Sequence, residues 1–365
     1  MRLTLLIDHL GAGGAQRQAS ALHQAWVDQG LDARLVYYHP HHHFKDTLNG
    51  EARERVTYLD AKGPIQRILA VRRYLEEHPT DVLVSFLVGP TLLAYVLDGL
   101  LRPKWRWIVS ERSALLSQYR PMRRRLYIRA LQACDRVVPN SAAGREELVR
   151  GGVSRETIEV MPNGLQLTAA MNAASTKRAP GPMRLLMVGT ISRVKNHAAV
   201  LRALAGLSDH DWTLDLVGRT TEPEVEDELH GLVKAHGLSE RVRFHGTQSD
   251  VGSFYAKAHL LLLPSTFEGF PNVILEAWAW GCPPLVSRFG DLPDLVGGGT
   301  RGIPVDVTRE GPLRDALREL LADPTPLKRM ADAGYAHVRT TYPLPTVAAS
   351  WAQLAQRVHH AGRPS

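Results

Sequence analysis

L-L-L-L-P-S-T-F-E-G-F-P-N-V-I-L-E-A-W-A-W-G, residues 260–281, is the stretch that decides the fold of this chain. Its leucines end at Pro264 and predict a buried strand. A loop with Gly and Pro follows, and the next apolar run predicts a helix that begins near Asn272 or Val273. Glu268 then lies on the loop, and Glu276 lies in the first helical turn or just after it. A strand, a loop and a helix in this order form the repeating unit of parallel α/β proteins.

The same unit recurs in both halves of the chain, where short apolar segments alternate with amphipathic helical patterns. The first half offers the strands R-L-T-L-L-I-D, A-R-L-V-Y-Y, V-L-V-S-F, W-I-V-S and R-V-V-P-N. The second half offers R-L-L-M-V-G, T-L-D-L-V-G, V-R-F-H-G and L-L-L-L-P. This alternation predicts an α/β protein made of two Rossmann-like domains, each with a parallel sheet covered by helices.

The boundary between the two halves is predicted from composition. The segment L-Q-L-T-A-A-M-N-A-A-S-T-K-R-A-P-G-P, residues 165–182, is rich in Ala, Ser and Thr and has no strong period. We expect an N-terminal Rossmann-like domain over 1–165, a linker over 166–182, a C-terminal Rossmann-like domain over 183–342 and, within 343–365, a helix that crosses back to the first domain.

Cysteine content and the apolar segments of the chain argue against a disulfide-rich secreted protein and against a membrane-spanning protein. The chain has 365 residues and only two cysteines, Cys134 and Cys282, so a disulfide framework is not expected and a cytoplasmic setting is the default. The N-terminus is typical of a first strand and not of a signal peptide. Residues 82–101 approach the length of a membrane span, but Gly89-Pro90 interrupts them, which predicts a buried strand, a turn and a buried helix.

Positive charge is concentrated in residues 102–129, which hold nine basic residues against one acid, Glu111. This density indicates a surface for phosphates or anionic lipid headgroups. We expect the apolar residues of this segment to form one stripe among the arginines: Met122, Leu126, Tyr127, Ala130 and Leu131. The alternative is a solvated basic helix that packs its apolar side on the core. Too few aromatic residues are interleaved for a nucleic-acid reader, so no nucleic-acid partner is predicted.

Loops that follow strands are the candidate binding sites, because ligands of open parallel sheets bind beyond the carboxyl ends of the strands. D-H-L-G-A-G-G-A-Q-R follows the first strand and precedes a helix over about 15–26, which favours an anion or else is a plain tight turn. It lacks the G-x-G-x-x-G spacing, which makes an NAD-dependent dehydrogenase a remote alternative. W-I-V-S-E-R-S, residues 107–113, offers Ser110, Glu111 and Arg112, unless Arg112 only makes a local contact.

The equivalent loop of the second half is V-G-T-I-S-R-V-K-N-H, residues 188–197. Asn196 is expected to cap the following helix, and Arg193 and Lys195 are placed to reach a phosphate, unless they are simply solvated. Glu276 is either a ligand-binding carboxylate or a partner of the helix dipole. Glu268 lies on a loop where carboxylates can accept hydrogen bonds from sugar hydroxyls. The histidines of 39–43 have no fixed metal geometry, and we identify no D-x-D pair that would hold a divalent ion, so no metal is predicted.

Taken together, these motifs resemble the family 4 retaining glycosyltransferases of the GT-B fold over nearly the whole chain. G-G-A-Q-R is similar to the family's N-terminal glycine loop, C-D-R-V-V-P-N-S to a strand-and-helix block, and M-P-N-G to the end of the N-domain. P-S-T-F-E-G-F-P-N-V-I-L-E-A-W-A-W-G-C-P-P-L-V resembles the glutamate block, which has two Glu separated by seven residues. The resemblance implies two parallel sheets that face a central cleft, with the acceptor domain over 1–165 and the nucleotide-sugar domain over 183–342.

The resemblance also implies roles for individual residues. Glu276 would bind the ribose of a nucleotide-sugar donor, Glu268 the hydroxyls of the transferred sugar, and Lys195 the diphosphate. Donor-binding positions implied by the family are Gly14, Gly269, Phe270, Pro271, Asn272, Thr190, His245 and Gly246. Catalytic positions are Glu268, Lys195, Arg193, Glu111 and Arg112. Acceptor or membrane contacts would come from Arg17, Arg123, Arg124 and Arg125.

The sequence departs from the family pattern at three places. Thr190 stands where an Arg is common, and Arg193 is the candidate replacement. Ser110, Glu111 and Arg112 stand where an N-domain His is common, and Gln166 replaces an Asp. A nucleotide-sugar-binding protein that has lost transferase activity is therefore kept as an alternative, with Thr190 as its support.

The implied function is transfer of a hexosyl or N-acetylhexosaminyl group from a nucleotide-diphosphate sugar, with a UDP-sugar preferred, without a cofactor or metal. The expected acceptor is a glycan, carried on a polyprenyl diphosphate, in surface polysaccharide or glycoconjugate assembly. A small soluble acceptor is the alternative. The basic segment suggests a cytoplasmic protein that binds peripherally to the anionic inner face of the cell membrane.

Overall fold

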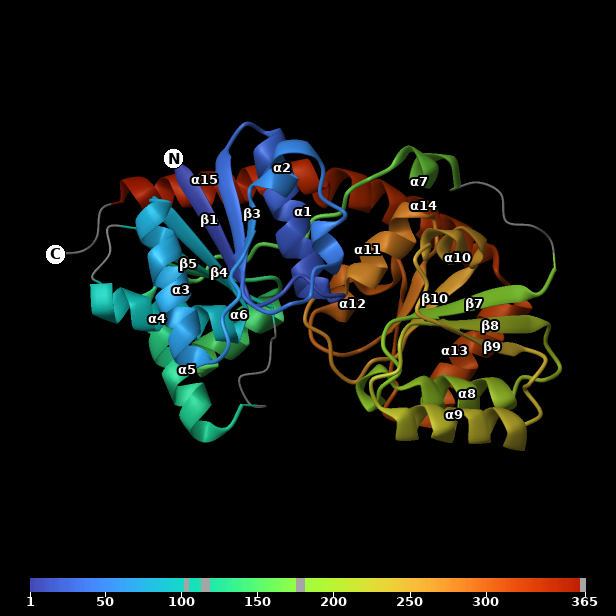
Figure 1. The fold of residues 1–365 in the computed structure, drawn as a ribbon. Coiled ribbons are helices and arrows are strands. Elements are labelled where there is room, and N and C mark those ends of the chain that lie inside the picture. Colours follow the sequence, from blue (N-terminus) through green and yellow to red (C-terminus); the bar gives the residue numbers. More distant parts are fainter. Residues whose placement is uncertain (102–104, 113–118, 175–180, 362–365) are drawn as a thin grey trace. The chain divides into compact units, whose positions relative to one another are not determined.

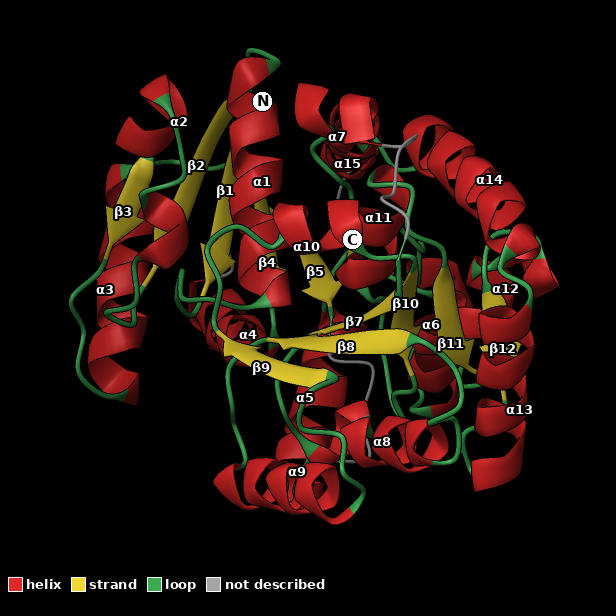
Figure 2. Ribbon diagram, turned by 90° about the vertical axis from the view of Figure 1, so that its right-hand side faces the viewer, coloured by secondary structure: helices red, strands yellow, loops and turns green. Residues whose placement is uncertain are grey.

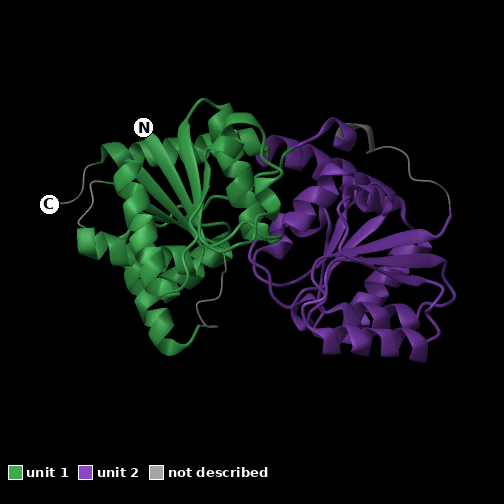
Figure 3. Cartoon of the chain, viewed as in Figure 1, with its two compact units in different colours: residues 1–166, 343–365 green, residues 167–342 purple. Residues whose placement is uncertain are grey.

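The computed structural model describes residues 1–101, 105–112, 119–174 and 181–361 (Figure 1). The chain divides into two compact units (Figure 3). Unit 1 comprises Met1–Gln166 together with Pro343–Ser365, and unit 2 comprises Leu167–Tyr342. Residues 166–182, predicted as a linker, include a short helix, α7 (Ala169–Ala174), and residues 175–180 lie outside the described part of the chain.

Unit 1 contains a six-stranded parallel sheet with the order β3-β2-β1-β4-β5-β6. Its strands are β1 (Arg2–Ile7), β2 (Asp32–Tyr37), β3 (Val56–Tyr58), β4 (Val82–Phe86), β5 (Arg106–Glu111) and β6 (Arg136–Pro139). Residues of β4 and β5 are buried throughout, which is the pattern of strands covered on both faces.

Helices of unit 1 pack into two hydrophobic cores, one on each face of the sheet. They are α1 (Gly14–Asp28), α2 (Gly50–Glu54), α3 (Pro64–Glu77), α4 (Val88–Leu101), α5 (Pro121–Ala133), α6 (Ala142–Arg150) and α15 (Leu344–His360). The last helix, α15, packs on α1, where the Trp26 indole N–H donates to the Ala348 carbonyl at 3.1 Å. The Trp26 and Trp351 rings meet edge to face with centroids 6.5 Å apart, so the end of the chain completes the core of unit 1.

Residues 82–101 form β4 and α4, which confirms the predicted strand, turn and helix. The turn lies one step earlier than expected, because Leu87 adopts a φ of 71° and the helix already begins at Val88. Pro90 then sits in the first turn, where its missing N–H has no intrahelical partner to lose. None of the helices in the described ranges is long and apolar enough to cross a membrane.

Unit 2 has a second six-stranded parallel sheet, in the order β12-β11-β10-β7-β8-β9. Its strands are β7 (Met183–Val188), β8 (Trp212–Val217), β9 (Val242–Gly246), β10 (Leu260–Leu263), β11 (Pro284–Ser287) and β12 (Ile303–Val305). The chain runs outward from β7 through β8 and β9, then returns to place β10 on the other side of β7. The β7–β10 edge is therefore a topological switch point, the usual ligand position in such sheets.

Helices cover both faces of the unit 2 sheet (Figure 2). They are α7, α8 (His197–Ala205), α9 (Pro223–Ala235), α10 (Gly252–Lys257), α11 (Asn272–Ala279), α12 (Leu292–Leu295), α13 (Glu310–Ala322) and α14 (Thr325–Thr341). One face carries α8, α9 and α13, whose apolar residues join the core of the sheet. The opposite face carries α10 and α11 (Figures 1 and 2), and Glu276 is a residue of α11.

Candidate functional site

The stretch 260–281 folds as the sequence predicts. β10 ends at Leu263, a loop follows, and α11 begins at Asn272. Glu268 lies on that loop, whereas Glu276 is the fifth residue of α11 and stands past its first turn. Because the helix-dipole effect falls off within the first turn, dipole stabilisation does not explain Glu276.

Glu276 is buried, with 7% of its surface exposed. Its Oε2 accepts a hydrogen bond of 3.0 Å from the hydroxyl group of Tyr255 on α10. A buried carboxylate is costly unless it is hydrogen-bonded, so this contact stabilises the charge where it stands.

Lys195 and Glu268 meet at the switch point. Lys195 ends a short 3-10 turn (Arg193–Lys195) between β7 and α8, and its Nζ lies 2.6 Å from Oε1 of Glu268. The side chains are 23% and 10% exposed, so solvent screens this ion pair less than a surface pair. The structure thus brings together two of the residues that the sequence singled out, from loops 73 positions apart.

Backbone contacts fix the two loops against each other. The Thr266 N–H donates to the Val194 carbonyl at 2.9 Å, and Asn196 Nδ2 donates to the Pro264 carbonyl at 3.3 Å. Asn196 stands at the N-cap position of α8 but makes no capping hydrogen bond with its side chain. The predicted side-chain cap is therefore wrong, because the left-handed backbone of Asn196, with φ 54°, turns the amide group toward the neighbouring loop.

Two glycines lie at the strand ends near Lys195, so no side chain covers the backbone there. Gly189 and Gly218 follow β7 and β8 with φ values of 148° and 151°, which side chains rarely adopt. A Cβ on Gly218 would lie 1.8 Å from the Gly189 carbonyl oxygen, and a Cβ on Gly189 would lie 3.5 Å from Cε of Lys195. The two strand ends can approach this closely only because residue 218 is glycine.

Positive charge at this loop resides on Lys195 and Arg193. His197, the first residue of α8, is 4% exposed, and burial together with the charge of Lys195 lowers its pKa to about 4. Its ring is therefore neutral at pH 7. Arg193 is 67% exposed and its Nη1 lies 3.5 Å from Glu228 on α9, so the structure does not bring its guanidinium to the Lys195–Glu268 pair. Thr190 is half-buried directly after Gly189.

The remaining donor-binding candidates of unit 2 lie at the end of β9 and in the loop before α11. His245 lies near the end of β9, where its Nε2 is 2.7 Å from Oδ1 of Asp215 and its ring meets Phe254 edge-on at 4.8 Å. Gly246 ends β9 with a φ of 60°. In the loop before α11, Gly269 and Phe270 are half-buried, and the Phe270 ring packs 5.8 Å from that of Tyr342. Pro271, at the N-cap position, is buried, and Asn272 is the first residue of α11.

In unit 1, the candidate residues Arg112 and Glu111 form hydrogen bonds with side chains of the same unit. Arg112 Nη1 donates to Asn163 at 2.7 Å and its Nε donates to Ser110 at 2.7 Å. Burial lowers the pKa of Arg112 to about 10, against the opposing effect of the Glu111 charge, so the guanidinium stays charged at pH 7. Glu111 is buried at the end of β5 and accepts a hydrogen bond from Tyr127. Ser113 lies outside the described residues.

The guanidinium of Arg112 also lies over the rings of Phe86 and Trp351, at 5.3 Å and 5.6 Å. Gly14 is the first residue of α1, and Arg17 is exposed one turn further along that helix. The predicted helix over about 15–26 is confirmed by α1.

The predicted apolar stripe of α5 is wrong as a single surface. Tyr127, Ala130 and Leu131 are fully buried in the core of unit 1, whereas Met122 and Leu126 are 85% and 42% exposed. The division follows position along α5, because all of Pro121–Leu126 is exposed and burial begins at Tyr127. The exposed end of α5 therefore carries Met122 and Leu126 with Arg123, Arg124 and Arg125.

Two arginines counted in the basic segment do not belong to that surface. Arg106 is 7% exposed and its Nη2 pairs with Asp135 at 2.9 Å, and Arg112 packs as described above. Arg102 and Lys104 lie outside the described residues. The sequence predicts a larger basic surface than the structure has, because the segment includes β5, whose residues are buried.

The histidine run 39–43 packs against aromatic neighbours. Nδ1 of His42 lies 2.6 Å from the Tyr37 hydroxyl oxygen, and the His41 ring meets that of His9 at 5.4 Å. Within the described ranges, no group of three or more His, Cys, Asp or Glu side chains is arranged to hold a metal ion.

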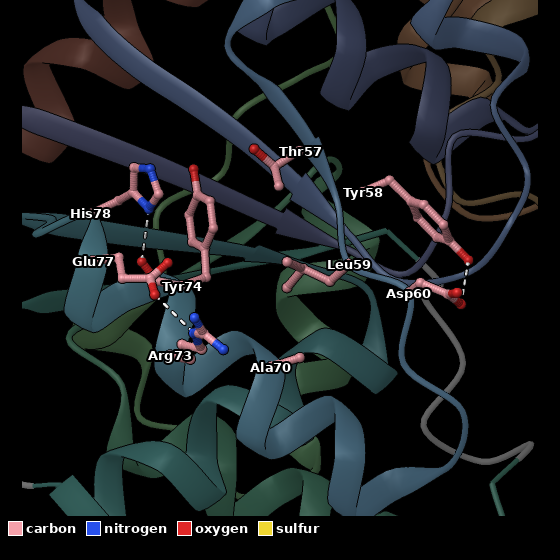
Figure 4. A pocket seen from close by; sticks show the side chains of 9 residues that line it. All are labelled: Thr57, Tyr58, Leu59, Asp60, Ala70, Arg73, Tyr74, Glu77 and His78. Carbon is pink, nitrogen blue, oxygen red and sulfur yellow. Dashed lines mark hydrogen bonds and ion pairs between the residues drawn. The ribbon is translucent and has the colours of Figure 1, made fainter.

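A separate hollow of about 370 Å³ lies in unit 1 between β3 and α3 (Figure 4). Its polar side chains are largely paired with one another, since Arg73 bonds Glu77 at 2.8 Å and Tyr58 bonds Asp60 at 3.2 Å. None of the residues that the sequence singled out lines this hollow. The switch point of unit 2, where Lys195 and Glu268 meet, remains the candidate site.

Known families match each of the two units. The family described as "Glycosyltransferase Family 4" matches residues 12–169, and "Glycosyl transferases group 1" matches residues 172–337. The chain belongs to the family 4 glycosyltransferases. Its two matched segments fall in the two units, so this glycosyltransferase carries both halves of the family's architecture.

Relatives of this glycosyltransferase act on different acceptors. An N-acetylgalactosamine-N,N'-diacetylbacillosaminyl-diphospho-undecaprenol 4-alpha-N-acetylgalactosaminyltransferase of Campylobacter jejuni is 25% identical over 342 residues, 88% of this chain and 90% of that protein. A D-inositol 3-phosphate glycosyltransferase of Streptomyces bingchenggensis is 33% identical over 229 residues, 56% of this chain and 49% of that protein.

Solved structures show that this glycosyltransferase has the GT-B fold. HepE from Anabaena, in complex with UDP, superposes with a TM-score of 0.85 at 19% identity over 98% of this chain and 100% of that one. Sucrose-phosphate synthase from Thermosynechococcus elongatus gives a TM-score of 0.83 at 21% identity over 99% and 100%. The predicted GT-B fold class is confirmed.

Proposed function

We propose that this glycosyltransferase transfers a hexosyl or N-acetylhexosaminyl group from a UDP-sugar to a glycan acceptor, with retention of the anomeric configuration and without a metal ion. The observation that carries the donor part is the ion pair of 2.6 Å between Lys195 and Glu268, beside the bare backbone of Gly189. A cation suits a diphosphate, and a carboxylate suits sugar hydroxyls. The UDP bound in the HepE structure supports the choice of base.

In the proposed reaction, the bond between the anomeric carbon and the diphosphate oxygen breaks while the acceptor hydroxyl oxygen bonds to the same face of that carbon. The diphosphate keeps the electron pair of the broken bond, and one of its oxygens takes the acceptor proton. Lys195 stabilises the developing negative charge in place of a metal ion. Arg193 can join it, because its pair with Glu228 is exposed and 3.5 Å long, and such pairs contribute little.

We propose that the rest of the donor is bound by other residues of unit 2 and by the two glutamates. Glu276 binds the ribose hydroxyls, and Glu268 turns from Lys195 to the hydroxyls of the transferred sugar. The other proposed donor contacts are Gly269, Phe270, Pro271, Asn272, Thr190, His245 and Gly246.

We further propose that the acceptor is linked to a polyprenyl diphosphate at the inner face of the cell membrane. The Campylobacter relative, by its name, acts on a diphospho-undecaprenol substrate. On α5, the exposed Met122 and Leu126 stand among Arg123, Arg124 and Arg125, which suits a helix that lies on anionic lipid. Surface polysaccharide or glycoconjugate assembly is the corresponding role.

Replacing Arg123, Arg124 and Arg125 together with serine is expected to abolish flotation with anionic vesicles. Each basic residue near an anionic surface contributes about 1 kcal/mol, so membrane partitioning falls roughly 100-fold. The control replaces three exposed arginines of unit 2 with serine: Arg309, Arg318 and Arg329. Equal flotation of both triple variants would contradict a docking role for α5.

The two glutamates give the sharpest test of the donor proposal. Glu276→Gln is expected to weaken both UDP and a UDP-sugar by about 10-fold or more, because it removes a charge-assisted hydrogen bond to the ribose. Glu268→Gln is expected to weaken the UDP-sugar alone, and UDP itself binds as well as before or better, since Lys195 loses its competing partner. Calorimetric titrations with UDP and with UDP-glucose or UDP-N-acetylgalactosamine measure both constants.

A glutamate far from the switch point serves as the matched control. Glu319 is exposed on α13, and Glu319→Gln should leave both constants unchanged. Equal weakening of UDP by the two site variants would contradict the assigned roles. Binding of UDP-sugars without transfer to any acceptor would instead favour a binding protein that has lost activity, the alternative that Thr190 supports.

A further inference from the structure

We propose that Tyr255 is a positioning residue, which fixes the Glu276 carboxylate in the orientation that receives the ribose hydroxyls of the donor. This inference rests on the proposed role of Glu276. Tyr255 is 1% exposed, and its hydroxyl group donates to Oε2 of Glu276 at 3.0 Å. The two residues come from different helices, α10 and α11.

The chemistry of this contact suits a carboxylate that also binds a ligand. An ionised carboxylate has about four lone-pair sites, and the hydroxyl group of Tyr255 donates to one of them. A glutamate side chain has several rotatable bonds, and holding it in one rotamer before binding reduces the entropy lost on binding. A tyrosine that is itself locked by packing is suited to this task.

Packing makes α10 a rigid support for α11. A Cβ on Gly252, the first residue of α10, would lie 2.6 Å from the indole ring of Trp280, which follows α11. The residue before Tyr255, Phe254, meets the ring of His245 edge-on at 4.8 Å. Consecutive residues of α10 therefore contact Glu276 and His245, two of the proposed donor-binding side chains.

The competing explanation is that Tyr255 only fills the core and satisfies a buried carboxylate. A purely structural role would make Tyr255→Phe weaken all ligands of the site alike. A positioning role confines the effect to ligands that carry the ribose hydroxyl which Glu276 receives. Deoxynucleotides separate the two explanations.

The experiment compares UDP with 2′-deoxy-UDP and 3′-deoxy-UDP by calorimetry on the full chain. The wild type is expected to bind UDP more tightly than at least one deoxy analogue. Tyr255→Phe is expected to weaken UDP by about 5- to 10-fold, the size of one ordinary hydrogen bond, and to leave that analogue's constant within twofold. Tyr335→Phe, on α14, is the matched control and should change neither constant.

A double variant keeps the test decisive if Tyr255→Phe also lowers stability. In a Glu276→Gln background, Tyr255→Phe is expected to add less than about a twofold change, because Tyr255 acts through Glu276. Equal weakening of UDP and the deoxy analogues by Tyr255→Phe would overturn the inference while the role of Glu276 stands. A wild type that does not distinguish UDP from either analogue would overturn the role of Glu276 itself, and the inference with it.

Discussion

Lys195→Ala is expected to lower the rate of sugar transfer by about 100- to 1,000-fold, which is the range for removing one group that stabilises transition-state charge. Lys195 supplies the cation at the switch point, because His197 beside it is neutral at pH 7 and Arg193 is turned to Glu228. The loss should appear mainly in kcat, since charge on the diphosphate grows as the anomeric bond breaks. Steady-state kinetics with a radiolabelled UDP-sugar measures it.

Two comparisons separate this effect from damage to the fold. Lys195→Ala leaves Glu268 only 10% exposed and without its partner at 2.6 Å, so the melting temperature must be measured alongside activity. Lys195→Arg keeps the charge and should retain more activity than the alanine variant. Lys234→Ala, on the exposed side of α9, should behave as the wild type. A kcat within threefold of the wild type for a folded Lys195→Ala protein would refute the assigned role.

Gly218→Ala is expected to destabilise unit 2 by roughly 3 kcal/mol or more, because both the backbone conformation and the space exclude a side chain. The φ of 151° is unfavourable for alanine, and the new Cβ would lie 1.8 Å from the Gly189 carbonyl oxygen. Since neither backbone can move without disturbing the ends of β7 and β8, the site beside Lys195 is lost as well. Thermal unfolding should show a melting temperature lower by about 10 °C.

Gly231→Ala is the matched control for this prediction. Gly231 lies within α9, has an ordinary helical backbone, and an added Cβ would meet nothing within 4 Å. Alanine is the better helix former, so this variant should be as stable as the wild type or slightly more stable. A Gly218→Ala protein that melts within 2 °C of the wild type would show that the strand ends can separate without cost.

Much of the fold was predictable from the chain because its central strands are buried on both faces. Segments such as V-L-V-S-F and L-L-L-L carry a continuous apolar signal, and they became β4 and β10. The strands β3, β11 and β12 were not predicted. The strands β3 and β12 are edge strands and β11 lies next to β12, and all three are only three or four residues long, too short for a periodic pattern to emerge.

The candidate site was predictable in part. Glycines, a strand end and a helix start placed Glu268 and Glu276 on different elements, as the structure has them. The partner of Glu276 was not found, because Tyr255 precedes it by 21 positions and only the packing of α10 on α11 joins them. A useful signal was available, since the polar tip of a tyrosine within an apolar segment needs a partner when it is buried.

The distribution of charge along the sequence predicted the surface of the protein less well than the apolar segments predicted the strands. The basic segment 102–129 reads as one surface in the sequence, but β5 and α5 divide it between the core and the solvent. Arg106 is buried against Asp135, and Tyr127 turns inward to Glu111. Net charge along a sequence does not show which side chains share a face, and this depends on the helix phase and on strand burial.

The central claim is that this glycosyltransferase moves a sugar from a nucleotide diphosphate with retention and without metal. The most direct measurement incubates the purified wild-type chain, in the presence of EDTA, with a panel of UDP-hexoses and UDP-N-acetylhexosamines and a polyprenyl-diphosphate-linked glycan. Mass spectrometry detects the product, and NMR reads the configuration of the new bond. We expect one donor whose sugar is transferred with its anomeric configuration kept. Failure to consume any UDP-sugar, an inverted linkage, or activity that returns only with a divalent metal would contradict it.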